Sequence, residues 1–319
     1  MKKIMKKLNN WLPVLSVVLA MVVELVLVNA SKHIPAKHPY FVYLLVAFLA
    51  IFTIIALAAY YNKKAKTWIE ENALFVGAAI LFLNLLNIFT KKLALFPVIY
   101  FPSIDKILGI IVEEREFLAL CLASSGKLLF IGYFFGAIAG FATGIGVGFS
   151  KKASYWINPL IRILGPIPAT AWIPLVLISF PTTFTASAFL IALAVWFPTT
   201  VMTSSGILNV ENAYFEVSST LGAGKYYQIF KVGVPAAMPH MFIGLFNGTC
   251  ASFITLMTAE MLGVKNGIGW YINWQKEMMS YANVYAGLII IAVTFSILIT
   301  LLFKVRDYVL VWQKGVIKW

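Results

Sequence analysis

The chain alternates long apolar runs with short polar segments. Runs close to the roughly 20 residues that a membrane-spanning helix needs occupy residues 11–30, 40–61, 72–90, 125–149, 167–181, 184–208, 239–262 and 284–303. Their apolar positions are continuous rather than alternating, which favours helices over the strands of a membrane barrel. The pattern therefore predicts an all-α polytopic membrane protein with about eight transmembrane helices. Residues 167–181 are short for a straight crossing, which predicts a break or a tilt there.

Composition supports a membrane protein. The hydrophobic fraction is 61% and the mean hydropathy is +0.89, whereas soluble domains are about 45–50% apolar. Lysines precede the first apolar run, as in a secretory signal peptide, but this run is long enough to span and contains Glu24. We therefore expect it to remain in the mature protein. Cys121 and Cys250 have no metal-binding or redox spacing and are expected to be packing residues.

The net charge of +13 indicates orientation rather than nucleic-acid binding, because no basic cluster belongs to a soluble module. With the N-terminus inside, the larger share of the 25 Lys and Arg residues lies on the cytoplasmic side, as the positive-inside rule expects. The clearest inside markers are Lys2, Lys3, Lys6, Lys7, Lys63, Lys64, Lys66, Lys151, Lys152, Lys304, Arg306, Lys314 and Lys318. Lys32, Lys37, Lys91 and Lys92 run against the rule. Both termini are predicted to be cytoplasmic.

Residues 216–235, EVSSTLGAGKYYQIFKVGVP, form a polar, Gly-bearing segment between two apolar runs. Glu216 stands six residues before Gly222, and Gly222 stands ten residues before Val232, which opens a Val-Gly-Val-Pro run. This spacing resembles the EAA motif of bacterial ABC importer permeases: E-A-A, three residues, G, nine residues, then I-x-L-P. Val217 and Ser218 replace the two alanines, and Val232 and Val234 replace Ile and Leu.

The resemblance implies a cytoplasmic coupling loop, residues 209–238, whose short coupling helix seats in a groove on a separate ATPase subunit. The residues expected to couple to that subunit are Glu216, Ser218, Leu221, Gly222, Ala223, Tyr226, Val234 and Pro235. It also implies that the partner ATPase binds ATP and Mg and that this chain has no cofactor. A phosphate loop at Gly222–Lys225 is rejected, because the required earlier Gly is missing and Tyr226 occupies the Ser or Thr position.

The segment also supports this interpretation without the family. Leu221, Tyr226 and their apolar neighbours are too apolar for a free loop and suit a protein groove. Gly222 and Gly224 predict a sharp turn between two short helices. Glu216 is expected to favour a helix N-terminus, and Pro235 to open the next helix in its first turn.

The resemblance extends over about two thirds of the chain. Phe101-Pro102-Ser103 opens a predicted interfacial helix, residues 103–118, and resembles the F-P-S-P entry of the nitrate, sulfonate and taurine branch, with Ile104 in place of the second proline. The GPIPATAWIPL and TAEMLG runs belong to the same resemblance. It implies residues 1–66 as an extra N-terminal transmembrane hairpin, and residues 67–319 as a permease transmembrane domain with a six-helix type I core.

Glycines recur at a spacing of four within residues 125–149, at Gly132, Gly136, Gly140, Gly144 and Gly148. Small residues near one face of a membrane helix let another helix backbone approach closely. We favour ordinary helix packing. A sliding surface used during opening is the alternative.

Several further residues are candidates for a pathway or gate. Discontinuous helices in transporters often mark a site, so the Gly165–Pro168 run predicts either a cavity or a simple kink. Glu24 is expected to make a polar packing contact or to face a wet cavity, and Glu260 to serve as a gate or a structural hydrogen-bond acceptor. The candidate pathway or gate residues are Trp172, Trp196, Asn247, Thr255 and Glu260.

No catalytic or metal site is predicted, because the histidines and acidic residues are scattered. The resemblance implies a non-catalytic permease subunit in the bacterial cytoplasmic (inner) membrane. Its expected partners are a dimer of ABC ATPase subunits, an extracytoplasmic substrate-binding protein, a second permease copy and membrane lipid, with no nucleic acid. The rivals are a secondary transporter or channel without an ATPase, and a membrane sensor or scaffold.

Overall fold

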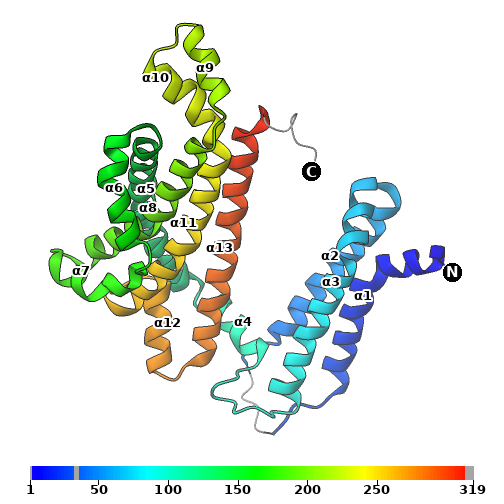
Figure 1. The fold of residues 1–319 in the computed structure, drawn as a ribbon. Helices are drawn as coiled ribbons and strands as arrows, with labels where there is room; N and C mark the ends of the chain where they lie inside the picture. The colour runs from blue at the N-terminus through cyan, green and yellow to red at the C-terminus, as the bar shows by residue number, and fades with distance from the viewer. Residues whose placement is uncertain (1, 32–35, 313–319) are drawn as a thin grey trace. The chain divides into compact units, whose positions relative to one another are not determined.

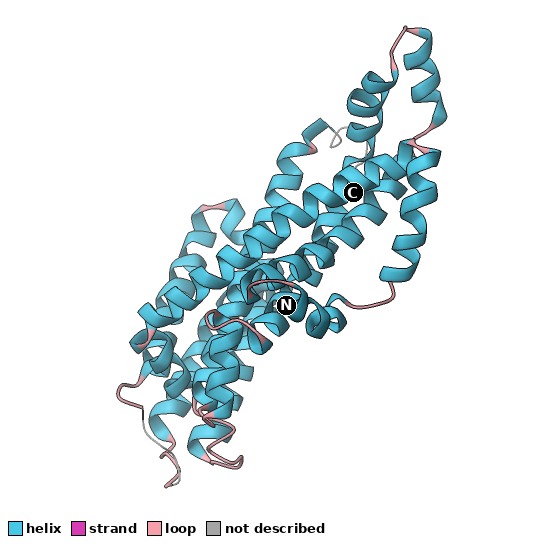
Figure 2. Cartoon of the chain, turned by 90° about the vertical axis from the view of Figure 1, so that its left-hand side faces the viewer, coloured by secondary structure: helices cyan, strands magenta, loops and turns pink. Residues whose placement is uncertain are grey.

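The computed structural model describes residues 2–31 and 36–312, and every regular element in these ranges is helical (Figures 1 and 2). Lys32, Lys314 and Lys318, used above for orientation, lie outside the described ranges. Six described helices are long and apolar enough to cross a membrane: α2 (Tyr40–Tyr61), α3 with the π-helix η1 (Lys63–Lys92), α5 (Arg115–Phe149), α8 (Thr183–Leu208), the continuous run α10–η3–α11 (Lys225–Leu262) and α13 (Tyr281–Val309). The all-helical membrane fold is confirmed.

The other two predicted crossings differ from straight spanning helices. In α1 (Lys2–Val26), the apolar part is shorter, Trp11–Val26. The fifth crossing is a bent pair: α6 (Lys151–Leu164) meets η2 and α7 (Ala169–Ser179) at 85°. The bend falls at the Gly165–Pro168 run, where the prolines remove backbone donors. The hydropathy pattern missed α6 because Lys, Ser, Asn and Arg side chains interrupt its apolar positions.

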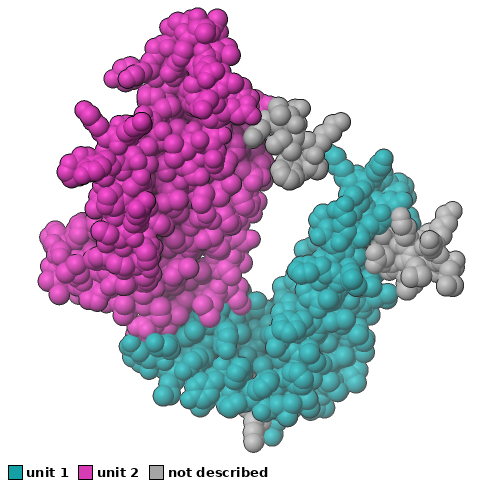
Figure 3. Space-filling model, in the orientation of Figure 1, with its two compact units in different colours: residues 1–115, 275–286 teal, residues 116–274, 287–319 magenta. Residues whose placement is uncertain are grey.

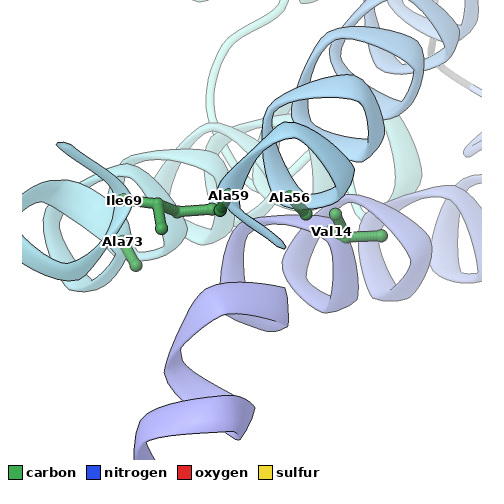
Figure 4. Packing of buried hydrophobic residues seen from close by; sticks show 5 residues of the cluster. All are labelled: Val14, Ala56, Ala59, Ile69 and Ala73. Carbon is green, nitrogen blue, oxygen red and sulfur yellow. The ribbon is translucent and has the colours of Figure 1, made fainter. Parts of the chain in front are cut away.

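The chain divides into two compact units (Figure 3). Unit 1 comprises residues 1–115 and 275–286, and unit 2 comprises residues 116–274 and the chain from residue 287. This division differs from the predicted boundary at residue 66, because α3 packs with α1 and α2. One apolar cluster joins all three helices through Val14, Ala56, Ala59, Ile69 and Ala73 (Figure 4). Its alanines allow close helix approach.

A buried ionic cluster also ties unit 1 together. The Lys91 ammonium bridges the Glu24 and Asp105 carboxylates at 2.5 and 2.6 Å. Lys92 donates to the carbonyls of Glu24 and Leu27, at 2.7 and 2.8 Å, near the C-terminal end of α1. Both lysines lie in η1 (Ile88–Lys92). Their charges are matched by carboxylates, which explains why they depart from the positive-inside pattern, and Glu24 is a polar packing residue.

Other short helices complete the two units. In unit 1, α4 (Ile104–Glu113) begins after Ser103, which is extended but makes no side-chain cap bond. In unit 2, α9 (Asn212–Thr220) and α10 (Lys225–Tyr227) lie at one end of the bundle, and α12 (Ile268–Glu277) lies at the opposite end (Figure 1).

Candidate functional site

The five glycines of α5 that recur at a spacing of four each receive one side chain of α8. A Cβ at Gly132 would lie 2.6 Å from the Ile191 Cβ, and one at Gly140 would lie 2.6 Å from the Thr199 Cβ. Gly136, Gly144 and Gly148 face Val195, Thr203 and Ile207 in the same way. All five α8 side chains are β-branched and stiff. Because each sits in its own recess, sliding along the axis would require all five to leave their recesses together, which favours fixed packing.

Helix α8 also packs against α11 (Val234–Leu262), although less tightly at Gly244 and Gly248 than against α5. A Cβ at Gly244 would lie 3.1 Å from the Thr199 Cα, and one at Gly248 would lie 3.2 Å from a Val195 methyl carbon. Hydroxyl groups complete the packing: the Thr143 and Thr200 hydroxyls lie 2.8 Å apart, and the Trp196 indole donates to Thr143 at 3.1 Å. The three helices α5, α8 and α11 therefore form one interlocked block.

One cavity of about 290 Å³ collects three of the five candidate pathway residues: Trp196, Asn247 and Thr255. Its wall on the other side is the bend of the α6–α7 pair, from Leu164 to Thr170. The lining side chains are apolar or carry uncharged indole, amide and hydroxyl groups. Such a surface can stack against a small solute and donate hydrogen bonds to it, without an ion pair.

The two remaining candidates lie elsewhere. Trp172 ends η2 (Ala169–Trp172) and packs against an apolar cluster that includes Ile173 and Leu190. Glu260 is 1% exposed near the end of α11 and accepts a 2.8 Å hydrogen bond from the Gly269 N–H. Gly267 has φ +128°, and a Cβ there would fall against the Glu260 carboxylate. Glu260 thus fastens the turn between α11 and α12, which is the geometry of a structural hydrogen bond.

The 216–235 segment begins inside α9. Glu216 is the fifth residue of this helix, so the expectation that it lies at a helix N-terminus is wrong. The helix starts earlier because Glu211 adopts a non-helical conformation directly before Asn212. The helix ends in a Schellman motif. The Gly222 N–H donates to the Ser219 carbonyl and the Ala223 N–H donates to the Ser218 carbonyl, both at 2.9 Å. Gly222 has φ +82°, a conformation that suits glycine.

The second half of the segment, after Gly224, is continuous with α11 of the bundle. After Gly224, α10 continues as the π-helix η3 (Gln228–Gly233) and then as α11, with Pro235 in its first turn. The Gln228 amide donates to the Ser219 hydroxyl at 2.7 Å and ties the two halves together. π-Helices are frequent at functional sites.

The segment exposes apolar side chains at the end of unit 2. Leu221 and Tyr226 are each 81% exposed, and Val217, Tyr227 and Phe230 are also exposed. Of the predicted coupling residues, Glu216 and Gly222 are exposed, Ser218 is buried, and Ala223, Val234 and Pro235 are half-buried.

Motif reasoning missed the residues that hold this segment to the bundle. Phe149, the last residue of α5, contacts Phe215 of α9 edge to face, with ring centroids 5.9 Å apart. A Cβ at Gly233 would lie 3.2 Å from two Phe149 ring carbons. The available sequence signal was the position of Phe149 directly after the last glycine of the stripe. Among the described residues, no group of three His, Cys, Asp or Glu side chains could hold a metal ion.

Known proteins are similar to this chain in sequence. A putative aliphatic sulfonates transport permease protein of Bacillus subtilis is 33% identical over 163 residues, covering 51% of this chain and 59% of the relative. A nitrate import permease protein of Leptolyngbya laminosa is 30% identical over 173 residues, covering 53% and 62%. The chain thus spans about three fifths of the length of these relatives.

The fold has a counterpart among solved structures. A chain of the inward-facing MetNI methionine ABC transporter aligns with a TM-score of 0.53 at 16% identity, covering 62% of this chain and 98% of that one. The family model described as binding-protein-dependent transport system inner membrane component matches residues 132–310, more than half of the chain. The resemblance drawn from residues 216–235 is thereby confirmed, and the protein belongs to the binding-protein-dependent transport system inner membrane component family.

Proposed function

We propose that this chain is the permease subunit of an ATP-driven ABC importer and that residues 216–235 dock on a separate ATPase subunit. The observation that carries this proposal is the exposed apolar surface of that segment, where Leu221 and Tyr226 are each 81% exposed. Exposed apolar patches mark interaction sites. The Schellman turn at Gly222 holds α9 and α10 in a defined shape, so the surface is preformed for a groove on the partner.

The remaining parts of the importer follow from this role. A dimer of ATPase subunits binds ATP and Mg and hydrolyses the ATP. The permease chain is non-catalytic. A second copy of this chain completes the pathway, and an extracytoplasmic binding protein delivers the solute. Both termini and the 216–235 segment face the cytoplasm, an orientation that the distribution of Lys and Arg supports.

The cavity beside Trp196 is the proposed transient binding site for the solute. The solute belongs to the class of nitrate, sulfonates, taurine and similar small anions, and the names of the two relatives support nitrate and sulfonates. The Asn247 amide and the Trp196 ring face a space of about 290 Å³ without a lining cation. Conduction requires sites weak enough to release the solute. Selectivity therefore belongs mainly to the binding protein.

A secondary transporter would need buried ionisable groups that are free to take up a coupling ion. The buried carboxylates of Glu24 and Asp105 are already paired with Lys91. The Glu260 carboxylate accepts from the backbone of Gly269. The pairing of Glu24 and Asp105 with Lys91 favours an ATPase outside the chain as the energy source.

Affinity purification tests the proposal. A tagged chain, produced with its neighbouring genes, should co-elute with an ATPase subunit. Tyr226→Asp should abolish this co-elution, because a carboxylate would enter an apolar groove. Tyr61→Asp serves as the matched control, since Tyr61 is 95% exposed at the end of α2 and is remote in sequence from the segment. Co-elution that is absent for the wild type, or unchanged by Tyr226→Asp, would contradict the docking role.

A further inference from the structure

Phe149 lies where three segments of unit 2 meet. Its ring contacts Phe215 of α9 at a right angle, with an interplanar angle of 88°. It also lies against the bare backbone of Gly233, which is buried at the end of η3. On the bundle side, Phe149 packs with the cluster of Ile207, Ala237 and Met241. One side chain therefore touches α9, the end of η3 and the interlocked block.

The chain reverses direction immediately after this residue. Ser150 is extended, with φ −128° and ψ 116°, and its hydroxyl accepts from the Ala153 N–H at 3.3 Å to start α6. The α6 helix has no buried side chain. A groove of about 1080 Å³ runs beside it, lined by Phe149, Ser154, Asn158 and Ser204 among others. This open space leaves α6 room to tilt about Ser150.

The far end of α6 forms part of the cavity wall. Leu164, its last residue, and Gly165 both line the cavity that holds Trp196 and Asn247. A helix of 14 residues is about 21 Å long. A small rotation at Ser150 is therefore amplified into a displacement of the cavity wall.

We propose that Phe149 is a positioning residue that carries movement of residues 216–235 to the α5–α6 junction and, through α6, to the solute cavity. This inference rests on the proposed function, because the ATPase supplies the movement. When α9 and η3 shift together, the Phe149 ring must follow, since it is held between Phe215 and Gly233. The α5–α8 recesses hold the rest of α5 in place. The displacement is thus directed into Ser150 and α6.

The test follows the exposure of α6 during the ATPase cycle and needs no solute. Tyr155, which is 73% exposed on α6, is replaced by Tyr155→Cys in a background with Cys121→Ala and Cys250→Ala. The complex with its ATPase is reacted with a charged maleimide, first without nucleotide and then with ATP and vanadate. We expect the labelling rate to change at least threefold.

Phe149→Ala should abolish this nucleotide-dependent change while ATPase co-elution and ATP hydrolysis persist. Phe149→Leu should restore part of it. Phe215→Ala alters the other side of the contact, on a largely exposed helix, and should have the same effect even if Phe149→Ala fails to fold. Phe141→Ala is the control, because Phe141 packs with the same Ile207 cluster. The Phe141→Ala variant should retain the nucleotide-dependent change in labelling rate.

The outcomes separate the two proposals. A wild-type chain that binds no ATPase contradicts the proposed function, and the relay with it. A wild-type complex whose labelling change survives in both Phe149→Ala and Phe215→Ala overturns the relay alone. Equal losses in Phe141→Ala and Phe149→Ala also overturn it, since they would assign Phe149 to core packing.

Discussion

Gly140 of α5 lies directly against Thr199 of α8: a Cβ at position 140 would be 2.6 Å from the Thr199 Cβ and 3.1 Å from the Trp196 carbonyl oxygen. The same relationship repeats along the helix pair. Helix association in lipid depends on close packing of this kind. We therefore expect the pair to be a rigid part of unit 2.

Gly140→Leu should disrupt this packing. The added side chain has no space between the helices, and overpacking of this kind costs about 1–3 kcal/mol or more. Thermal unfolding of the purified chain in lipid nanodiscs measures the loss. Gly126→Leu is the matched control, because a Cβ at Gly126 of the same helix meets no atom within 4 Å. Equal destabilisation by the two variants would contradict the interlocked packing.

The turn between α11 and α12 gives a second prediction. Gly267→Ala should destabilise the protein about as much as Glu260→Ala, because the new Cβ meets the Glu260 carboxylate and φ is +128°. Glu260→Gln retains an acceptor for the Gly269 N–H and should stay close to the wild type in stability and uptake. Unfolding temperature and uptake are measured on the same preparations. A Glu260→Gln variant with wild-type stability but no transport would instead indicate a gate.

The ionic cluster of unit 1 gives a third prediction. Lys91→Met would leave Glu24 and Asp105 as buried carboxylates without their shared cation, which costs about 3–5 kcal/mol. Adding Asp105→Asn should recover most of this loss, because Glu24 keeps Lys92 at 3.3 Å and no buried carboxylate then remains unpaired. Limited proteolysis between α3 and α4 reports the opening of unit 1. A Lys91→Met/Asp105→Asn double variant no more stable than Lys91→Met would show that the unpaired charge is not the cause.

The parts of the fold that follow local rules were predictable from the sequence. Continuous apolar runs indicated the membrane helices, and the Gly165–Pro168 run indicated the bend. The Gly222 turn and Pro235 in the first turn of α11 follow from backbone preferences that act at single positions.

The rest depends on contacts between residues far apart in the chain. Glu24 and Lys91 are 67 residues apart, and their pairing could not be deduced from either alone. The α6 helix lacked a continuous apolar run. The start of α9 depends on the conformation of Glu211 rather than on the charge of Glu216. Phe149 belongs to no motif, and its role arises from the neighbours that the fold supplies.

The cavity gives a fourth prediction, about the sign of the solute's charge. Asn247→Asp places a carboxylate in a lining without a cation. It should reduce uptake of an anionic solute at least tenfold, whereas Asn247→Ser should have a small effect. ATP hydrolysis by the complex should continue in both variants. Unchanged anion uptake in Asn247→Asp would show that the solute does not pass through this cavity.

Two neighbouring glycines test the proposal that residues 216–235 couple this chain to an external ATPase. A Cβ at either Gly222 or Gly224 meets no atom within 4 Å. Gly222 has φ +82°, whereas Gly224 has φ −71°. A side chain at Gly222 therefore strains the turn by roughly 1–2 kcal/mol, and one at Gly224 does not.

The decisive measurement is uptake per ATP hydrolysed by the reconstituted complex, for Gly222→Leu and Gly224→Leu at equal membrane abundance. We expect Gly222→Leu to lower this ratio at least tenfold and Gly224→Leu to lower it much less. Normal uptake per ATP in Gly222→Leu would show that this segment is not the coupling element.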